Sequence, residues 1–373
     1  MVRPDGFRYA CTRGMTEIGD RKADHLALCA QEDVGFRATS TLLECVRLVH
    51  DALPDLKLED VDTSLVLLGK RLRAPIIIAS MTGGTEEAGR VNRELAQIAE
   101  ERGYGFGLGS QRAMHMRPAV ASTYQVRDFA PKTLLLGNVG MVQARGMSTD
   151  ALRALIEQVG ADALCVHLNP AMELVQPGGD RDFSEGLETI ARLVSELGAP
   201  VVVKETGCGI SPSVGQRVRR VGAKHVDVSG AGGTSWVGVE TKRAGAAGQA
   251  AAQALGEALW DWGIPTAASI ALLGPMGFDT LIATGGMAAG LDIARAIALG
   301  ATAAGLARPV LRALVQGGRR GATEFLDGAE RELRTVMFLT GSRNLAALRT
   351  APRVIWGELA SWIEQLRRPN HER

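Results

Sequence analysis

Short runs of aliphatic residues recur along the chain. Each run is followed by a glycine-rich turn and then by a stretch with apolar residues three to four positions apart. A short apolar run between turn residues indicates a buried strand, and the longer spacing indicates an amphipathic helix. Alternating strands and helices favour a parallel sheet, because each helix returns the chain to the same edge. The pattern therefore predicts a series of βα units.

Eight apolar runs meet this description, which is the number that closes a (β/α)8 barrel. The expected strands are residues 75–79, 105–108, 133–137, 163–167, 200–204, 225–228, 280–283 and 301–306. The clearest helical patterns are residues 88–102, 149–160, 184–197 and 290–299, and each ends near a glycine, as helices often do. We therefore expect an α/β fold, with one TIM-barrel domain over residues 1–373 and the barrel itself at 74–309.

Two extensions flank the expected barrel. Residues 1–73 precede the first strand, and residues 310–373 follow the last strand and end in an amphipathic stretch at 354–367. We expect helices in both extensions to close the barrel. The alanine-rich stretch 244–258 is also typical of a helix.

Composition restricts the functional classes. The chain has 373 residues, 46% of them hydrophobic, and a formal net charge of +1, so nothing favours nucleic acid or a polybasic membrane anchor. The N-terminus has no signal core, and the apolar runs are too short to span a membrane. The cysteines are scattered without metal-ligand spacing, at Cys11, Cys29, Cys45, Cys165 and Cys208. We expect a soluble cytoplasmic protein with reduced thiols.

Polar residues and glycines follow the expected strands, at the barrel end where enzymes of this fold place their chemistry. The first strand runs into ASMTGG, where Thr82 supplies a hydroxyl, although such a segment can also be a simple βα turn. The second runs into GLGSQR, where Arg112 suits a bidentate phosphate contact. The third ends in GNVG, where Asn138 can bond a ring carbonyl or an amide. These segments predict a ligand site at this end.

The fourth and fifth strands carry the strongest candidates. HLNPAMELVQPGGDRDF places His167, Asn169 and Glu173 just after an apolar strand. The fifth strand ends in VVVKETG, where a lysine charge is costly unless it is paired. Lys204 is therefore either a site residue or half of a structural ion pair.

The last strands indicate a phosphate site. DVSGAGGTSW follows the sixth strand, and Gly285 and Gly286 follow the seventh, just before an expected helix. Backbone N–H groups at a helix N-terminus attract anions. The chain has neither a GxGxxG dinucleotide fingerprint after an early strand nor a Walker A sequence. Flavin mononucleotide (FMN) is therefore better supported than a dinucleotide.

An ordered set of motifs resembles the type 2 isopentenyl-diphosphate isomerases along nearly the whole chain. The motifs are RKADHL, ASMTGG, GLGSQR, GNVG, HLNPAME, GDRDF, VVVKETG, DVSGAGGTSW, TAAS and ATGG, in that family's order. The resemblance implies an FMN-dependent barrel that interconverts isopentenyl and dimethylallyl diphosphate without net redox change. It also implies Mg2+, a flavin reduced by NAD(P)H or another donor, a role in isoprenoid biosynthesis and a homotetramer or homo-octamer.

The resemblance also implies roles for individual residues. FMN contacts would come from Ala79, Ser80, Met81, Thr82, Ser110, Asn138, Lys204, Ser229, Thr234, Gly285, Gly286 and Ala307. Contacts to the prenyl diphosphate would come from Arg21, Lys22, His25, Ser110, Gln111, Arg112, His167 and Asn169. Glu173 would hold the magnesium, and the catalytic group would comprise His167, Asn169, Lys204 and position 172. The arginines and lysine near the N-terminus can also be a solvated arm.

Position 172 departs from the family pattern, which has glutamine where this chain has methionine. A thioether has no N–H and is a weak acceptor. Met172 therefore predicts a slow or inactive isomerase if the glutamine is essential, and an active one if the flavin alone carries the protons. Gln176, four residues later, is a conceivable substitute, although PGG makes a continuous helix unfavourable there.

Three alternatives follow from the same residues. A divergent flavoenzyme would act on another prenyl phosphate or a related compound, and a non-catalytic protein would only bind flavin or prenyl diphosphate. An FMN barrel that oxidises hydroxy acids rests on fold analogy, which does not establish function. The remaining histidines, His50, His115, His225 and His371, carry no assigned role.

Overall fold

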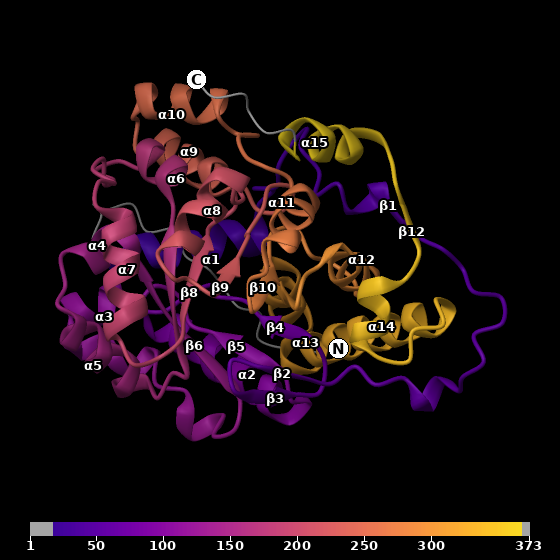
Figure 1. Ribbon diagram of the computed structural model, residues 1–373. Helices are drawn as coiled ribbons and strands as arrows, with labels where there is room; N and C mark the ends of the chain where they lie inside the picture. Colours follow the sequence, from indigo (N-terminus) through magenta and orange to yellow (C-terminus); the bar gives the residue numbers. More distant parts are fainter. Residues whose placement is uncertain (1–17, 368–373) are drawn as a thin grey trace, which may run out of the picture.

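Eight parallel strands form a closed barrel in the computed structural model, which describes residues 18–367 (Figure 1). The strands are β4 (Ile76–Ile78), β5 (Gly105–Gly107), β6 (Leu134–Gly140), β7 (Ala163–Leu168), β8 (Val201–Glu205), β9 (His225–Asp227), β10 (Thr280–Ala283) and β11 (Ala303–Leu306). They follow one another around the barrel in chain order, and β11 closes against β4. The eight expected strands and the (β/α)8 fold are confirmed.

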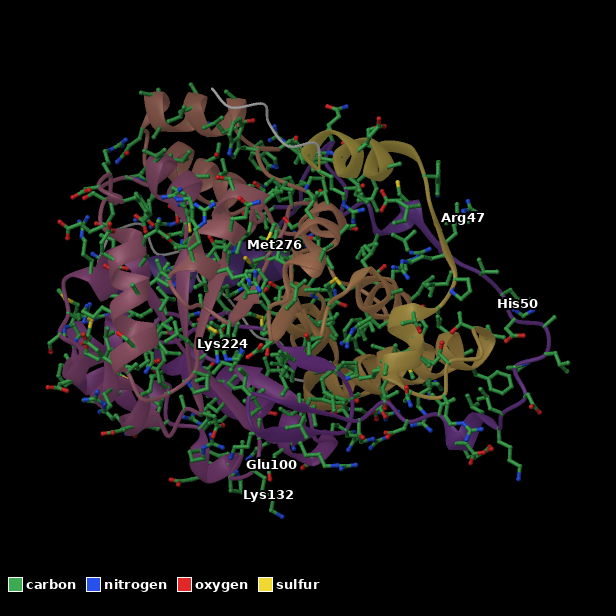
Figure 2. The ribbon with its side chains drawn as sticks, in the orientation of Figure 1. Arg47, His50, Glu100, Lys132, Lys224 and Met276 are labelled. Atoms are coloured by element: carbon green, nitrogen blue, oxygen red, sulfur yellow. The ribbon has the colours of Figure 1, made fainter. Side chains whose placement is uncertain are left out.

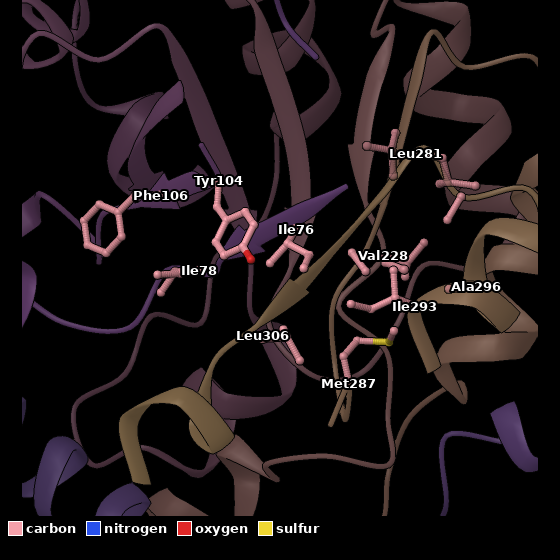
Figure 3. Close-up of a cluster of buried hydrophobic side chains, with 14 of the residues drawn as sticks. Ile76, Ile78, Tyr104, Phe106, Val228, Leu281, Met287, Ile293, Ala296 and Leu306 are labelled. Carbon is pink, nitrogen blue, oxygen red and sulfur yellow. The ribbon is translucent and has the colours of Figure 1, made fainter. Parts of the chain in front are cut away.

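Side-chain alternation along the strands builds two layers of apolar packing. One set of positions fills the barrel interior, including Ile77, Leu134, Ala163, Val202 and Ile282. The alternate positions face the surrounding helices, as Ile76, Ile78, Tyr104, Phe106 and Leu306 do (Figure 3). Both faces of the sheet are therefore apolar, which explains why the strands are uninterrupted aliphatic runs in the sequence.

The helices begin and end where local signals act. The expected helix 88–102 is α2 (Glu86–Arg102), in which Thr85 accepts a hydrogen bond from the Ala88 amide and Gly103 ends the helix with positive φ. The remaining helices around the barrel are α3 (Arg112–Met116), α4 (Met141–Arg145), α5 (Thr149–Val159), α6 (Pro170–Val175), α7 (Gly186–Glu196), α8 (Pro212–Arg220), α9 (Trp236–Ala246), α10 (Ala250–Ala258), α11 (Thr266–Leu273) and α12 (Gly290–Leu299). Short 3-10 turns are η3 (Pro118–Thr123), η4 (Arg127–Phe129) and η5 (Gly274–Met276). The alanine-rich stretch is two helices, because the chain turns at Gly248, which has positive φ.

The N-terminal extension differs from the expected helices. It contains α1 (Ile18–Gln31), η1 (Leu43–Cys45), β1 (Val46–Leu48), η2 (Leu58–Asp60) and a hairpin of β2 (Leu65–Leu67) and β3 (Lys70–Leu72). Leu67 and Leu72 of the hairpin are buried with the interior residues of the barrel. The amino-terminal end of the barrel is therefore plugged by a β-hairpin, because its two leucines complete the interior apolar layer.

The C-terminal extension is mainly helical. It contains α13 (Arg308–Leu339), which has a non-helical residue at Gly318, followed by α14 (Leu345–Thr350), β12 (Arg353–Ile355) and α15 (Gly357–Arg367). β12 pairs antiparallel with β1. The expected helix at 354–367 is therefore wrong at its start, where pairing with β1 draws Val354 and Ile355 into a strand.

Candidate active site

A cavity of about 420 Å3 lies at the carboxyl ends of the barrel strands. Segments that follow all eight strands contribute to its wall, and α1 adds His25, Leu26 and Cys29 from one side. The side chains that the sequence distributes over more than two hundred residues therefore meet at one end of the barrel, as expected for this fold.

The top of the barrel interior is polar, directly above the apolar layer. Continuing the strand alternation by two residues leads from Leu136 to Asn138, from Cys165 to His167 and from Val202 to Lys204. The same step leads from Ile282 to Thr284, and Asp227 lies on β9 between β8 and β10. Strand periodicity thus carries five polar side chains into one layer, which contributes to the floor of the cavity.

Lys204 is held by two neighbours in this layer. Its Nζ lies 2.8 Å from Asp227 Oδ2 and donates to Thr284 Oγ1 at 3.0 Å. Thr284 in turn donates to Asp227 Oδ1 at 2.6 Å. The three side chains form a closed triangle, so the structure realises both readings of Lys204: it is ion-paired and it lines the cavity.

His167 and Asn138 are also joined. Asn138 Nδ2 donates to the Leu108 carbonyl at 3.2 Å, so Asn138 Oδ1 is the acceptor for His167 Nδ1, 2.8 Å away. A histidine that donates from Nδ1 presents its Nε2 on the other side of the ring. Asn138 therefore orients the imidazole, and both residues line the cavity.

Glu173 is buried at the opposite wall, with 6% of its surface exposed. Its carboxylate accepts hydrogen bonds from Asn169 Nδ2 at 2.8 Å, Gln176 Nε2 at 3.2 Å and the Asp180 amide at 2.9 Å. Gln176 Oε1 is buried and has no hydrogen-bond partner among the described residues. The short helix α6 brings all of these groups together, since Asn169 precedes it and Gln176 ends it.

Arg112 reaches the same wall from the loop after β5. Its Nη1 lies 3.6 Å from Asp180 Oδ2, which also accepts a hydrogen bond from Gln143 Nε2 at 2.7 Å. Gln111, the residue before it, is turned away from the cavity and is fully buried. Its amide bonds the Leu155 carbonyl and the Asn138 amide, so it supports β6 and has no atom facing the cavity. The structure therefore does not bring Gln111 to the expected substrate site.

Glycines line the side formed by the loops after β9 and β10. A Cβ on Gly285 would lie 2.1 Å from the Gly230 carbonyl, and one on Gly233 would lie 2.3 Å from the Gly286 amide. Only glycine permits this close approach of the two loops. The expected helix at 290–299 is α12, which begins at Gly290. Gly285 and Gly286 therefore lie in the loop before it and not directly at its N-terminus. Asp292 accepts a hydrogen bond from the Ala288 amide across this turn.

Helix α1 is docked on the cavity by polar contacts with α9 and α13. His25 Nε2 lies 2.6 Å from Glu240 Oε1, and Arg243 Nη1 donates to Glu240 Oε2 at 2.7 Å. Lys242 pairs with Glu32 at 2.6 Å, and Arg312 donates to the Glu32 carbonyl. Arg21 and Lys22 belong to α1, but their side chains lie outside the described part of the structure, as do residues 1–17 with Cys11.

Most of the expected site residues share the cavity wall. These are His25, Ala79, Ser80, Met81, Thr82, Ser110, Arg112, Asn138, His167, Asn169, Met172, Glu173, Lys204, Ser229, Thr234, Gly285, Gly286 and Ala307. Asp227, Asp180 and Gln143 were not among the expected residues. Asp227 and Asp180 stand within DVSGAGGTSW and GDRDF, so the motifs marked their segments, whereas Gln143 has no signal in the sequence.

The other histidines lie away from the cavity. His50 is exposed on the loop after β1 at the edge of the molecule (Figure 2), and His115 is exposed in the last turn of α3. His225 is half-buried and bonds Thr280 Oγ1 at 3.1 Å; burial lowers its pKa. His371 lies outside the described residues. Across residues 18–367, no three His, Cys, Asp or Glu side chains gather as a metal cluster.

The described cysteines form no disulfide, and burial raises the pKa of Cys29 and Cys165 to about 12. A thiol with such a pKa is protonated and unreactive at neutral pH. Within the described chain, no helix combines the length and the apolar character that a bilayer crossing requires.

The fold agrees with that of known flavoprotein barrels. The model of the FMN-dependent dehydrogenase family matches residues 16–173 and 169–355. A variant flavocytochrome b2 with sulfite bound superposes with a TM-score of 0.66 at 20% identity, covering 88% of this chain and 81% of that one. A mandelate oxidase variant with an FMN adduct gives 0.60 at 18% identity, covering 88% and 95%. The protein is thus a TIM barrel of the FMN-dependent dehydrogenase type.

Curated relatives define a narrower group. The chain is 44% identical over 346 residues to the isopentenyl-diphosphate delta-isomerase of Methanosarcina barkeri, covering 92% of this chain and 94% of that protein. It is 42% identical over 349 residues to the enzyme of the same name from Methanothermobacter thermautotrophicus, covering 93% and 96%. The corresponding protein of Nostoc sp. is 44% identical over 344 residues, covering 91% and 96%. The chain belongs to the FMN-dependent isopentenyl-diphosphate delta-isomerases, and it is an isomerase.

Proposed function

We propose that this isomerase interconverts isopentenyl diphosphate and dimethylallyl diphosphate, using bound FMN and Mg2+. The observation that carries the proposal is the composition of the cavity in a chain 42–44% identical to enzymes of that name. One side offers glycine-lined backbone and buried hydroxyls. The other offers His167, Asn169, Arg112 and a buried carboxylate. These two sides match a flavin phosphate and a metal-bound diphosphate.

The residues present fit FMN. Thr82 Oγ1 is buried in the wall and has no hydrogen-bond partner in the described structure, so a ligand can satisfy it. A buried hydroxyl without a partner costs about 1–3 kcal/mol. Gly233, Gly285 and Gly286 allow a phosphate to approach the backbone closely, and Lys204 offers a positive charge to an electron-rich ring. When bound and reduced, FMN supplies the group that delivers and accepts the protons of the double-bond shift.

The opposite wall fits a divalent cation and a diphosphate. Mg2+ prefers oxygen ligands and keeps several waters, so one carboxylate, Glu173, with phosphate oxygens is a suitable set. Asn169, Gln176 and the Asp180 amide hold that carboxylate in place. Arg112 and His167 would bind the phosphate oxygens by charge-assisted hydrogen bonds. This distant anchoring positions the alkene for reaction.

Other parts of the proposal concern supply and assembly. We propose that NAD(P)H or another donor reduces the flavin, and that Arg21 and Lys22 of α1 add to the diphosphate site. The proposed setting is isoprenoid biosynthesis in the cytoplasm, with a homotetrameric or homo-octameric assembly.

A second candidate is a divergent flavoenzyme that acts on another prenyl phosphate. The observation behind it is Met172, which lines the cavity beside Glu173 and has no N–H to offer. Such a protein would bind FMN and a prenyl diphosphate but would not shift the double bond at a useful rate.

One anaerobic experiment separates the candidates. FMN-loaded protein is reduced chemically and given Mg2+ and isopentenyl diphosphate in D2O, and the product and its deuterium are followed by NMR. Dimethylallyl diphosphate with turnover supports the isomerase. Binding of both ligands without conversion supports the divergent enzyme, and a purified protein that does not bind FMN contradicts both.

A further inference from the structure

We propose that Asp227 and Thr284 are positioning residues that keep Lys204 charged and direct one N–H of its ammonium group into the cavity, toward the flavin. This inference rests on the proposed function, because it requires FMN beside Lys204. Asp227 does not line the cavity, so it acts through the residues that it bonds, Lys204 first among them.

The geometry follows from a count of donors and acceptors. An ammonium group has three N–H donors. Lys204 donates one N–H to Asp227 Oδ2 at 2.8 Å and another to Thr284 Oγ1 at 3.0 Å. Among the described residues, its third N–H has no hydrogen-bond acceptor. The Thr284 hydroxyl donates its hydrogen to Asp227 Oδ1 at 2.6 Å, so its oxygen is the acceptor for the Lys204 N–H. The closed triangle fixes the lysine and leaves one donor for a ligand.

Burial explains why the lysine needs a carboxylate. The side chains of Lys204 and Asp227 are 9% and 6% exposed. A buried ammonium group without a counter-charge loses its proton readily, because low polarity disfavours the charged form. Asp227 supplies that counter-charge, and the Ser229 amide donates to Asp227 Oδ1 at 3.2 Å and helps hold it in place. Ser229 has φ of 37°, a left-handed conformation that costs energy outside glycine, and it also lines the cavity.

Other ionisable groups around the triangle are few. Cys165 lies below it on β7, and burial raises its pKa to about 12, so the thiol stays neutral. His167 is next to Lys204 across the β7–β8 pairing. Glu205 follows Lys204 on β8, and burial raises its pKa to about 7. Within the described chain, Asp227 is therefore the only carboxylate bonded to Lys204.

The test measures the midpoint potential of bound FMN from pH 6 to 10 in the whole protein. The variants are Asp227→Asn, Lys204→Met and the double variant. Asp292→Asn, which removes a partly buried carboxylate from the first turn of α12, is the control. In Asp227→Asn we expect an additional change of slope in the plot of midpoint potential against pH, at the pH where Lys204 loses its proton. The wild type and the double variant should not show this change of slope. Across the break the preference for reduced over oxidised FMN should fall about tenfold, which is about 30 mV for a two-electron couple.

Two results would overturn the inference. The first is a plot of midpoint potential against pH for Asp227→Asn that coincides with that of the wild type. The second is a change of slope below pH 9 in the wild type that is absent from Lys204→Met. The wild-type comparison with Lys204→Met decides the matter even if Asp227→Asn does not fold, and Asp227→Ser gives a second route. A break near pH 7 that all variants share comes from a group other than Lys204, because it persists in Lys204→Met. Failure of the wild type to bind FMN contradicts the proposed function instead.

Discussion

At the scale of single residues, Met172 is the side chain whose chemistry most affects the proposed reaction. It lies in the cavity wall between Asn169 and Glu173 on the short helix α6. Its thioether sulfur carries no proton, so it cannot donate one to the alkene or donate a hydrogen bond to another group. Gln176 ends the same helix, and one N–H of its side-chain amide donates to Glu173.

Replacing the methionine tests this directly. Met172→Gln is expected to raise kcat for isopentenyl diphosphate at least about tenfold, because a positioned proton carrier typically contributes factors of 10²–10⁴. Turnover is measured anaerobically with reduced FMN and Mg2+, and Met172→Leu serves as the control of equal polarity. Equal rates for all three proteins would mean that no side chain at position 172 carries a proton.

Glu205 gives a prediction about stability and pH. Its carboxylate accepts hydrogen bonds from the amides of Thr206, Gly207 and Cys208, so it organises the loop that brings Thr206 and Gly207 to the cavity. Burial raises its pKa from 4.5 to about 7, although these amides oppose the effect. The folded protein thus binds the proton more tightly than the unfolded chain does.

The sign of the effect follows from this difference. The stabilisation is complete below about pH 4.5 and is lost as the pH rises through 7, with a total of about 3 kcal/mol. Glu205→Gln should remove this contribution. The measurement is the free energy of unfolding in urea at pH 5 and pH 8, with Glu257→Gln as an exposed control. A pH dependence that is the same in Glu205→Gln and in the wild type would contradict the assignment.

At the scale of elements, α1 is joined to α9 through a buried charge. Glu240 of α9 is fully buried and accepts from both His25 and Arg243. Removing one partner of a buried ion pair commonly costs about 3–5 kcal/mol, because the remaining charge stays in a dry environment. We expect this loss of stability to affect mainly the docking of α1, because regions of a protein can open locally without global unfolding.

Glu240→Gln should therefore loosen α1 without unfolding the barrel. We expect faster tryptic cleavage within residues 18–31 and a KM for isopentenyl diphosphate that rises more than kcat falls. Cleavage is followed by mass spectrometry, and Glu257→Gln, whose partner Arg37 is exposed, is the matched control. Unchanged cleavage would show that the apolar face of α1, with Leu26 and Cys29, is sufficient to dock it.

At the scale of the whole molecule, a strand of the N-terminal extension pairs with a strand of the C-terminal extension. β1 pairs with β12, and the fully buried Leu359 belongs to α15, which contacts α11. Residues 352–367 contribute nothing to the cavity wall. Stability and ligand binding are therefore separable here.

A chain that ends at Ala351 tests this separation. Loss of Leu359 burial alone removes about 2 kcal/mol, so we expect Tm to fall by about 3 °C or more. FMN affinity should stay within about twofold of the full chain, since local stability differs between regions. Calorimetry and flavin fluorescence titration measure the two quantities. A large loss of FMN affinity would show that the extension supports the barrel more broadly.

Sequence reasoning was most successful where the determining physics is local. The eight strands are confirmed because alternation and apolar runs depend only on neighbours in the chain, and α2 begins at Thr85 and ends before Gly103 for similarly local reasons. It failed where distant segments compete for a residue. Val354 joins a strand because β1 is beside it, and Leu67 and Leu72 plug the barrel because its interior apolar layer is open at that end.

By itself, the sequence determined the βα order, the end of the barrel that carries chemistry and the motifs of the isomerase family. Tertiary structure alone decided which polar side chains form hydrogen bonds and ion pairs with one another. Lys204 and Thr284 are 80 positions apart, and His25 and Glu240 are 215 apart. The Gln111 side chain points away from the cavity because it bonds the Leu155 carbonyl and the Asn138 amide. Such pairings arise when the barrel closes, since closure alone brings these strand ends and helices within hydrogen-bond reach.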